Sequence, residues 1–371
     1  MSDNRMDANG QRETACYGTG VSPVLETLGV ENRQHGRDAH ATGRPVRLAS
    51  WRLGGLLFVL VLASCLLPSI ARGQAGASLL VKPWEADQTL EDNTSGYLFS
   101  GGHTNETRDR FHMWDLESQG RLRLFPGNEA SPRVGYDMTY IGVHTTQPNF
   151  PGELLDLSVA GGTFLSKNNG WVTGVTLGAG YAGNAPFACG RAWYGRADFV
   201  LAKKFSDTDA LGIGLDYDGH RTYAPDIPLP GFGYSHQFDP TILMVIGVPV
   251  TSITWKPIPH LRAFADWVLL RDADVDIGYE FIPHWTVFGA FQSRDDAFHV
   301  TELPGNRRLL YQQRRVEMGL RFQAREDMTL SLAGGYAFDT DFRAGFDLRD
   351  YSRVLYASNE PFLSVEVRVQ F

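Results

Sequence analysis

The nine residues at the C-terminal end constrain the fold of this chain more than any other stretch. Apolar side chains occupy every second position there: Leu363, Val365, Val367, Val369 and Phe371. Polar side chains fill the places between them: Ser364, Glu366, Arg368 and Gln370. Successive side chains of a β-strand point to opposite faces, so this segment forms a ribbon with one apolar and one polar face. Because chain ends usually fray, we expect this strand to close a barrel whose apolar face meets lipid.

The pattern resembles the C-terminal signal of bacterial outer-membrane β-barrels. In that signal, an aromatic last residue and apolar residues at alternate positions before it are read by the insertion machinery. The resemblance implies two partners, the lipid bilayer and the barrel-insertion machinery. It also implies export to the bacterial outer membrane, and we ask whether the rest of the chain agrees.

The same alternation recurs through the chain. Trp114, Leu116 and Leu122 share one face of a segment whose other face carries Asp115 and Glu117. Comparable segments follow near residues 134–140, 155–159, 171–181, 193–201, 211–217, 261–267, 274–282, 285–299, 316–322 and 328–338. No stretch shows sustained helical periodicity. The sequence therefore predicts an all-β protein, a transmembrane antiparallel up-and-down β-barrel of about 12–14 strands.

The connections between these segments alternate in length. Those at 283–284 and 324–327 are short, whereas those at 345–361 and 222–239 are long. Outer-membrane barrels have short periplasmic turns and longer external loops, so we expect 222–239 to be a long external loop. The nearly all-apolar run 242–255 is expected to bend at Pro249, because proline cannot donate to a β-ladder.

The N-terminal part divides into three segments before the barrel. Residues 1–43 are polar and without periodicity, so they are disordered or a mis-assigned extension, with a true start near Val46. A basic and then apolar stretch at 44–73 predicts a signal peptide cleaved before Gln74. Cys65 follows a lipobox-like tripeptide, although a chance cysteine in the apolar region is the favoured interpretation. Residues 74–94 are expected to be a periplasmic lead-in, and 95–371 the outer-membrane barrel.

Charge and motifs exclude several function classes. The net charge is -8 and no basic stripe occurs, so we expect no nucleic-acid partner. No phosphate-binding loop, zinc-protease motif or CxxC pair is present, so we expect no cofactor and no metal. The nearest approach to a catalytic cluster is the run from Ser293 to Asp296 with His299. We expect no enzyme, although a barrel hydrolase built from residues distant in sequence stays open.

The polar faces of the predicted strands carry both signs of charge. The candidate lumen charges are Glu117, Arg121, Arg196, Asp198, Arg262, Asp266, Arg315, Glu317 and Arg321. Neighbouring members of this set are expected to form salt bridges across the lumen. A selective open channel more often shows a lining of one sign. The sequence therefore favours a narrow or partly occluded pore.

From about residue 122 to 371 the chain resembles an uncharacterised family of outer-membrane β-barrels, known only as a domain of unknown function. The features that carry the resemblance are the stretches 248–257, 279–285 and 334–339 and the terminal strand from Pro361. They are strand-and-turn motifs, and the resemblance implies fold and location only.

Three functions remain open at this point. The first is a passive, porin-like pore for small solutes or a purely structural barrel. The second is a binding or adhesion barrel that acts through the loop 222–239. The third is a soluble secreted all-β protein such as a sandwich or a propeller.

Overall fold

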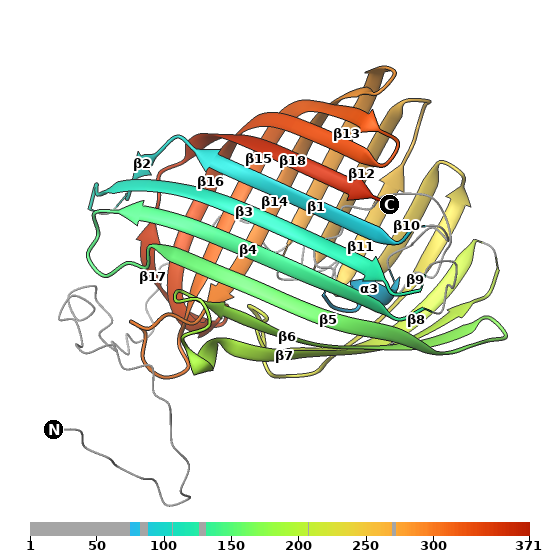
Figure 1. Ribbon diagram of the computed structural model, residues 1–371, viewed down its shortest axis with the longest axis horizontal. Helices are drawn as coiled ribbons and strands as arrows, with labels where there is room; N and C mark the ends of the chain where they lie inside the picture. The colour runs from blue at the N-terminus through green and yellow to red at the C-terminus, as the bar shows by residue number, and fades with distance from the viewer. Residues whose placement is uncertain (1–74, 82–87, 106, 126–130, 207, 269–271) are drawn as a thin grey trace, which may run out of the picture.

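The computed structural model describes residues 75–81, 88–105, 107–125, 131–206, 208–268 and 272–371, and these form one large barrel (Figure 1). The expected signal peptide and N-terminal extension lie outside the described residues. The strands are β1 (Leu90–Phe99), β2 (Gly102–His103), β3 (Arg110–Arg123), β4 (Arg133–Thr145), β5 (Glu153–Asn168), β6 (Trp171–Gly183), β7 (Trp193–Lys204), β8 (Asp209–Asp218), β9 (Leu229–Asp239), β10 (Ile242–Val248), β11 (Val250–Trp255), β12 (Leu261–Val268), β13 (Ala273–Ile282), β14 (Trp285–Phe298), β15 (Arg308–Arg325), β16 (Met328–Asp347), β17 (Asp350–Tyr356) and β18 (Glu360–Gln370). Two short helices complete the elements, α3 (Ser78–Val81) and η2 (Gly190–Ala192).

Sixteen of these strands form a closed antiparallel barrel, while β2 and β17 extend its rim. Each barrel strand pairs with its neighbour in the chain order, and β18 pairs with β1 along its length, from Glu91 opposite Gln370 to Phe99 opposite Phe362. Closure gives each of the sixteen barrel strands a partner on both sides, which is the only way a sheet can satisfy its backbone within lipid. The predicted all-β transmembrane barrel is confirmed.

The strand number exceeds the expected 12–14 for two local reasons. First, the expected external loop 222–239 is wrong, because Leu229–Asp239 forms β9 and the loop covers only 219–228. Second, the run 242–255 does not bend as one strand but folds back at Pro249, so that Val245 pairs with Ser252 and Ile242 with Trp255. Proline at this point ends the ladder of β10 and starts the return strand.

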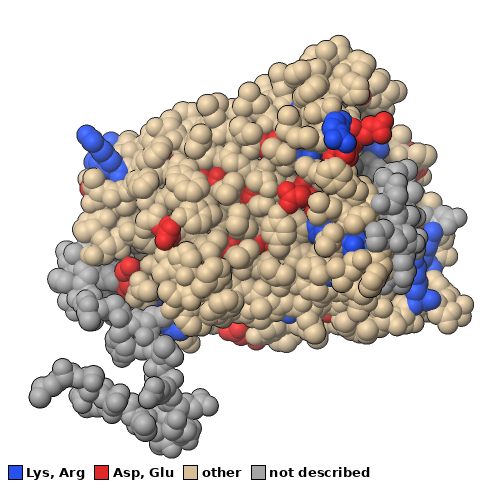
Figure 2. All heavy atoms as spheres, in the orientation of Figure 1, with Lys and Arg blue, Asp and Glu red and all other residues tan. Residues whose placement is uncertain are grey.

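The exterior of the barrel is apolar. Large apolar side chains that are exposed to the surroundings line the outside of most strands, among them Leu177, Met318, Leu332 and Leu363. In Figure 2 the Lys and Arg side chains gather mainly towards the two ends, and acidic atoms form only isolated spots between them. An apolar belt around a closed barrel is the signature of lipid contact, so this is a barrel of the bacterial outer membrane. The alternative of a soluble sandwich or propeller does not describe it.

Strand lengths differ sharply around the barrel. Strands β15 and β16 have 18 and 20 residues, whereas β10, β11 and β12 have seven, six and eight. Figure 1 shows the long strands reaching the far end of the barrel while β9, β10 and β11 stay near the end that holds the C-terminus. That end also carries the two-residue turns at 169–170, 283–284 and 326–327, which identifies it as periplasmic. The wall formed by β10, β11 and β12 is therefore shorter along the barrel axis than the wall formed by β15 and β16.

The barrel begins at Leu90, five residues before the expected boundary, and the segment before it is not a periplasmic lead-in throughout. Helix α3 packs against the inner wall formed by β4, β5 and β6. Its Leu79 and Leu80 are fully buried, and Arg133 Nη1 donates to the carbonyl oxygens of both at 3.0 and 3.2 Å. Within the described part of the chain, no helix is long and apolar enough to cross a membrane.

The external end of the interior is filled by a hydrophobic core. Inward side chains from β1, β3, β4 and β5 meet those from β14, β15, β16 and β18 as the two sheets of a sandwich would. The largest buried members are Tyr97, Phe99, Phe111, Met113, Ile141, Leu154, Phe298, Leu309, Tyr311, Phe342, Leu355 and Phe362.

Hydrogen bonds join opposite walls of the barrel on the external side of this core. The His299 amide, after β14, donates to the Ala182 carbonyl of β6 at 3.0 Å, although these strands are far apart in the sheet order. The loop 219–228 also folds inward, and the Leu348 amide donates to its Thr222 carbonyl at 3.0 Å. Arg308 donates to the carbonyls of His220 and Arg221, each at 2.9 Å. We call the core together with these bonds the outer closure.

Candidate functional site in the barrel lumen

Below the outer closure the barrel encloses a cavity of about 480 Å³. Its walls come from inward positions of nearly all barrel strands, and the N-terminal residues Gly76, Ala77 and Ser78 also face it. This volume lies within the usual range of small-molecule sites. Because the strands place inward and outward side chains alternately, the chemistry of the cavity is set by every second residue.

Acidic side chains dominate the lining. The carboxylates that border the cavity are Glu117, Asp137, Asp156, Asp198, Asp216, Asp266, Asp272, Asp274, Asp276, Asp296, Glu317 and Glu366. Among the described residues, the arginines of the lining are Arg196, Arg294 and Arg321. Three of the lining carboxylates also pair with arginines outside the lining, Asp216 with Arg221, Glu117 with Arg315 and Glu366 with Arg368. Both signs of charge are present, and carboxylates outnumber arginines in the lining. Low-dielectric walls focus this field and raise the local concentration of cations.

The first ion network lies where the cavity meets the outer closure. Arg294 of β14 crosses the interior to β3, with Nη1 2.8 Å from Asp115 Oδ2 and 2.5 Å from Glu117 Oε1. Its Nη2 donates to Thr139 of β4 at 2.7 Å. Arg315 approaches the same two carboxylates at 3.4 and 2.5 Å. Asp115 is fully buried, so this network joins two walls of the barrel and holds the closure in place.

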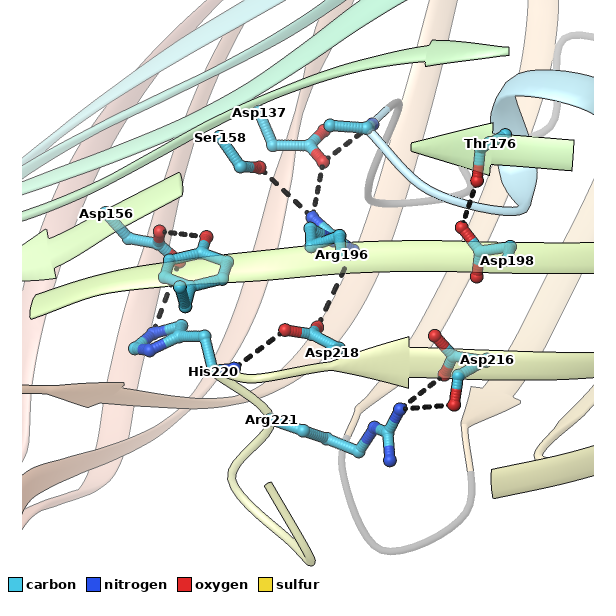
Figure 3. Close-up of polar contacts among 12 residues, drawn as sticks. Asp137, Asp156, Ser158, Thr176, Arg196, Asp198, Asp216, Asp218, His220 and Arg221 are labelled. Carbon is cyan, nitrogen blue, oxygen red and sulfur yellow. Dashed lines mark hydrogen bonds and ion pairs between the residues drawn. The ribbon is translucent and has the colours of Figure 1, made fainter. Parts of the chain in front are cut away.

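The second network centres on Arg196 of β7 (Figure 3). One guanidinium nitrogen lies 3.4 Å from Asp137 Oδ2 and donates to Ser158 at 3.1 Å, while the other lies 3.7 Å from Asp218 Oδ2. Asp198, two residues along the strand, accepts a bond from Thr176. Arg196 thus joins a carboxylate of β4 to a carboxylate of β8, although the strands β5, β6 and β7 lie between these two in the sheet.

A branch of this network reaches the inward-folded loop. The Tyr194 hydroxyl donates to Asp156 Oδ1 at 2.7 Å, and His220 Nε2 lies 3.4 Å from the other oxygen of that carboxylate. The His220 ring stacks on Tyr194 with centroids 4.7 Å apart. Arg221 lies 2.8 Å from Asp216 Oδ2. Lumen side chains therefore contact the inward-folded loop 219–228.

The N-terminal segment occupies part of the same space. The Ala75 amide donates to Asp137 Oδ2 at 2.8 Å, and Gly76 approaches so closely that a Cβ there would lie 3.1 Å from an Arg196 nitrogen. On the wall, Gly162 leaves room for Leu79 and Leu80, since a Cβ at that glycine would lie 3.2 Å from each of them. Sequence periodicity gave no signal for this contact.

Six of the nine candidate lumen charges border the cavity, namely Glu117, Arg196, Asp198, Asp266, Glu317 and Arg321. For three of the nine, the observed partners differ from the neighbours paired in the sequence. Arg121 pairs with Glu91 of β1 at 2.6 Å rather than with Glu117. Arg321 Nη1 donates to Asp276 at 2.9 Å, and Glu317 accepts a bond from Ser364 at 2.8 Å. Four residues that take part in the two networks were absent from the candidate set: Asp115, Asp137, Asp218 and Arg294.

The structure also places two other sets of residues singled out in the sequence, the C-terminal signal and the candidate hydrolase cluster. The apolar residues Leu363, Val365, Val367 and Val369 stand on the outward face of β18, and Phe371 directly follows the strand; Leu363 and Phe371 are more than half exposed. The members of the candidate hydrolase cluster alternate between the two faces of β14, with Ser293 and Asp295 on one face and Asp296 on the other. No group of three or more His, Cys, Asp or Glu residues that could hold a metal ion occurs in the described ranges.

No family model and no curated protein matches the chain. Solved structures with a similar outline are outer-membrane barrels. They include the Pseudomonas putida toluene transporter TodX (12% identity, 80% of this chain and 91% of that one, TM-score 0.37), a Pseudomonas aeruginosa FadL homologue (12%, 76% and 90%, 0.35) and the Acinetobacter baumannii outer membrane protein Omp33 (8%, 77% and 100%, 0.31). These scores are too low for the likeness to bear on function. The class is therefore defined by the fold and the lumen themselves, an outer-membrane β-barrel with an acidic interior.

Proposed function

We propose that this protein is an outer-membrane channel that favours small cationic solutes and that opens at its external mouth. The observation that carries the proposal is the lumen lining, with twelve carboxylates and three arginines among the described residues. Rings of acidic side chains are the usual means by which a pore favours cations. The lumen is narrow because arginines span it, and the inward-folded loop 219–228 takes the place of the expected long external loop.

The reversal potential of the refolded protein in a planar bilayer tests the ion preference. Under a KCl gradient we expect a reversal potential close to that of potassium. The double variant D198N/E317Q removes two lumen carboxylates and is expected to shift the reversal potential towards zero. The matched control D239N removes an exposed carboxylate at a periplasmic turn and should leave it unchanged. A preference for chloride in the unaltered protein would refute the proposal.

A reversible cross-link tests the external opening. Thr222 and Leu348 are joined by a backbone hydrogen bond across the mouth, so the double variant T222C/L348C brings two thiols together there. We expect oxidation to abolish most of the conductance and a reductant to restore it. Equal conductance in both redox states would show that this loop is not the gate. Silence of the unaltered protein at all voltages would favour the alternative of a purely structural barrel.

A further inference from the structure

Two glycines of the lumen wall leave room for the leucines of α3. Gly162 of β5 and Gly174 of β6 are buried and lie on adjacent strands. A Cβ at Gly174 would lie 2.7 Å from Leu80 Cδ1, well inside the separation of about 3.5 Å at which two carbon atoms attract each other. A glycine inside a strand often marks a place where a ligand or another backbone approaches closely. The wall therefore has room for Leu80 only while residue 174 carries no side chain.

Polar groups of the wall contact both ends of the same segment. At one end, the Ala75 amide donates to the carboxylate of Asp137 on β4. At the other end, Arg133 of β4 donates to two carbonyl oxygens of α3, and its guanidinium carbon lies 5.0 Å from the centre of the Phe164 ring. A carboxylate that accepts from an amide and a guanidinium that donates to carbonyls bind the backbone of a peptide. With the two glycines between them, these groups form a peptide-binding site inside the barrel.

The segment is not part of the β-sheet that carries the barrel. Helix α3 contacts β4, β5 and β6, but the described N-terminal residues 75–81 contribute no strand to the sheet. The helix is a single turn, in which the Leu79 amide donates to the Gly76 carbonyl at 3.0 Å. By contrast, β6 pairs with both β5 and β7 along its length. The segment can therefore leave the wall without breaking a β-ladder, and the chain keeps it tethered to β1.

We propose that residues 75–81 form a displaceable plug and that the inner wall of β4, β5 and β6 is its peptide-binding site. Gly76, Ala77 and Ser78 border the cavity, and Gly76 lies close to the Arg196 guanidinium. Departure of the plug widens the cavity and lets a cationic solute approach Asp137. This inference rests on the channel function proposed above, since the plug regulates that pathway.

An exchange of bulk between the wall and the plug tests the steric fit. In G174V the new side chain takes the space of Leu80, so we expect the plug to be displaced and the single-channel conductance to rise about twofold. The double variant G174V/L80A removes the opposing bulk and should bring the conductance back towards that of the unaltered protein. The control G161V alters an outward-facing residue of β5, where a Cβ would lie 3.9 Å from the Arg133 carbonyl oxygen, and should change nothing. Equal conductance of G174V and G174V/L80A would overturn the fit.

A peptide added in solution tests whether the wall is a binding site in its own right. The full-length variant L79S/L80S keeps the wall intact while its own plug is released. We expect the acetylated peptide amide of residues 75–81 to lower the conductance of this variant again. Millimolar peptide is needed, since a short tether gives the resident segment an effective concentration of that order. The same peptide with serine at both leucine positions is the control, and an equal response to the two peptides would overturn the site.

Thiol labelling follows the plug without any measurement of current. Leu79 is fully buried, so the thiol of L79C is expected to react slowly with N-ethylmaleimide in detergent, and at least about tenfold faster in L79C/G174V, where the segment has left the wall. The native Cys189 is buried, which limits its background reaction. Heat-modifiable mobility on a detergent gel confirms that each variant is folded.

The two readouts distinguish failure of this inference from failure of the channel proposal. Equal labelling rates in L79C and L79C/G174V would overturn the plug, even in a protein that conducts. Faster labelling in L79C/G174V, in a protein that stays silent in the bilayer, would support the plug and refute the channel.

Discussion

The two halves of the barrel interior differ although the same strands build both. Along β3, the inward residues Phe111 and Met113 are buried in an apolar core, whereas the inward residues from Asp115 onward are polar and, apart from Gln119, charged. At the external end the opposite walls touch, whereas nearer the periplasm they stand apart around the acidic cavity. The inward face of a barrel strand therefore changes from apolar to charged where the interior changes from packed to hollow.

The largest loss of stability is expected at the boundary between the packed core and the cavity. Replacing Asp115 with alanine leaves Arg294 and Arg315 without their shared buried carboxylate, which is expected to cost about 3–5 kcal/mol of stability. Urea unfolding in detergent, followed by heat-modifiable mobility, measures the loss. D216N is the control, because the Asp216 side chain is 41% exposed. Similar losses for the two variants would mean that the network does not hold the closure.

The packed half is tested by a matched pair of methionines. Met113 is fully buried in the outer core, whereas Met318 is 70% exposed on the outside of β15. M113A creates a cavity and is expected to destabilise the barrel by about 3 kcal/mol, while M318A is expected to cost less than about 1 kcal/mol. The same unfolding assay measures both. An equal loss would indicate that the outer core is loosely packed.

A pH effect is expected just above the packed half, at His299 in the loop after β14. Burial, and then the nearby Arg308 and Arg191, lower the pKa of this imidazole from 6.5 to about 4. The unfolded chain therefore binds a proton at a higher pH than the folded chain. The stabilisation is complete above pH 6.5 and is lost as the pH falls towards 4, by about 2 kcal/mol after allowing for partial solvent screening.

The H299Q variant is expected to remove that dependence on pH. The ratio of its unfolding midpoints at pH 7 and pH 4.5 should lie closer to one than that of the unaltered protein. Among the residues that the structure describes, the buried His299 Nδ1 has no hydrogen-bond partner, so the substitution breaks no bond with them at this atom. H144Q, at an exposed position of β4, serves as the control. An unchanged pH profile in H299Q would assign the effect to other groups.

The smallest effect is a change in conductance, which we expect when the N-terminal segment is released from the cavity. The double variant L79S/L80S weakens the packing of α3 on the inner wall and should release the segment from the lumen. We expect the single-channel conductance to rise about twofold, which corresponds to about 0.4 kcal/mol in the barrier to ion passage. S78A is the control. An unchanged conductance would mean that the segment does not narrow the pathway.

Sequence reasoning reached the barrel because alternation is a local property of each strand. It missed β9 because Pro230, Gly231 and Gly233 suggest a loop, although Phe232 and Tyr234 alternate with those glycines and Ser235. Glycine at the inward positions leaves the outward aromatic residues to carry the pattern. A period-2 search that accepts glycine as a polar-face residue finds this strand.

Pairing within the lumen was beyond sequence reasoning for a geometric reason. Glu117 and Arg121 share one face of β3 but lie about 13 Å apart along the strand, because each residue advances about 3.3 Å. Their true partners come from other strands, Arg294 and Arg315 for Glu117 and Glu91 for Arg121. Such contacts depend on the register of the whole barrel and on which walls approach one another.

The short strands β10 and β11 have a consequence for the membrane around the barrel. The seven residues of β10 extend about 23 Å along the strand, and a tilt of about 40° reduces the height they span to about 18 Å. The apolar band of such barrels is about 25 Å tall, and β15 and β16 exceed it easily. Lipid chains beside β10 and β11 must therefore shorten or tilt, while those on the opposite side keep their ordinary length. The protein deforms its bilayer asymmetrically, and this hydrophobic mismatch is relieved in thinner membranes.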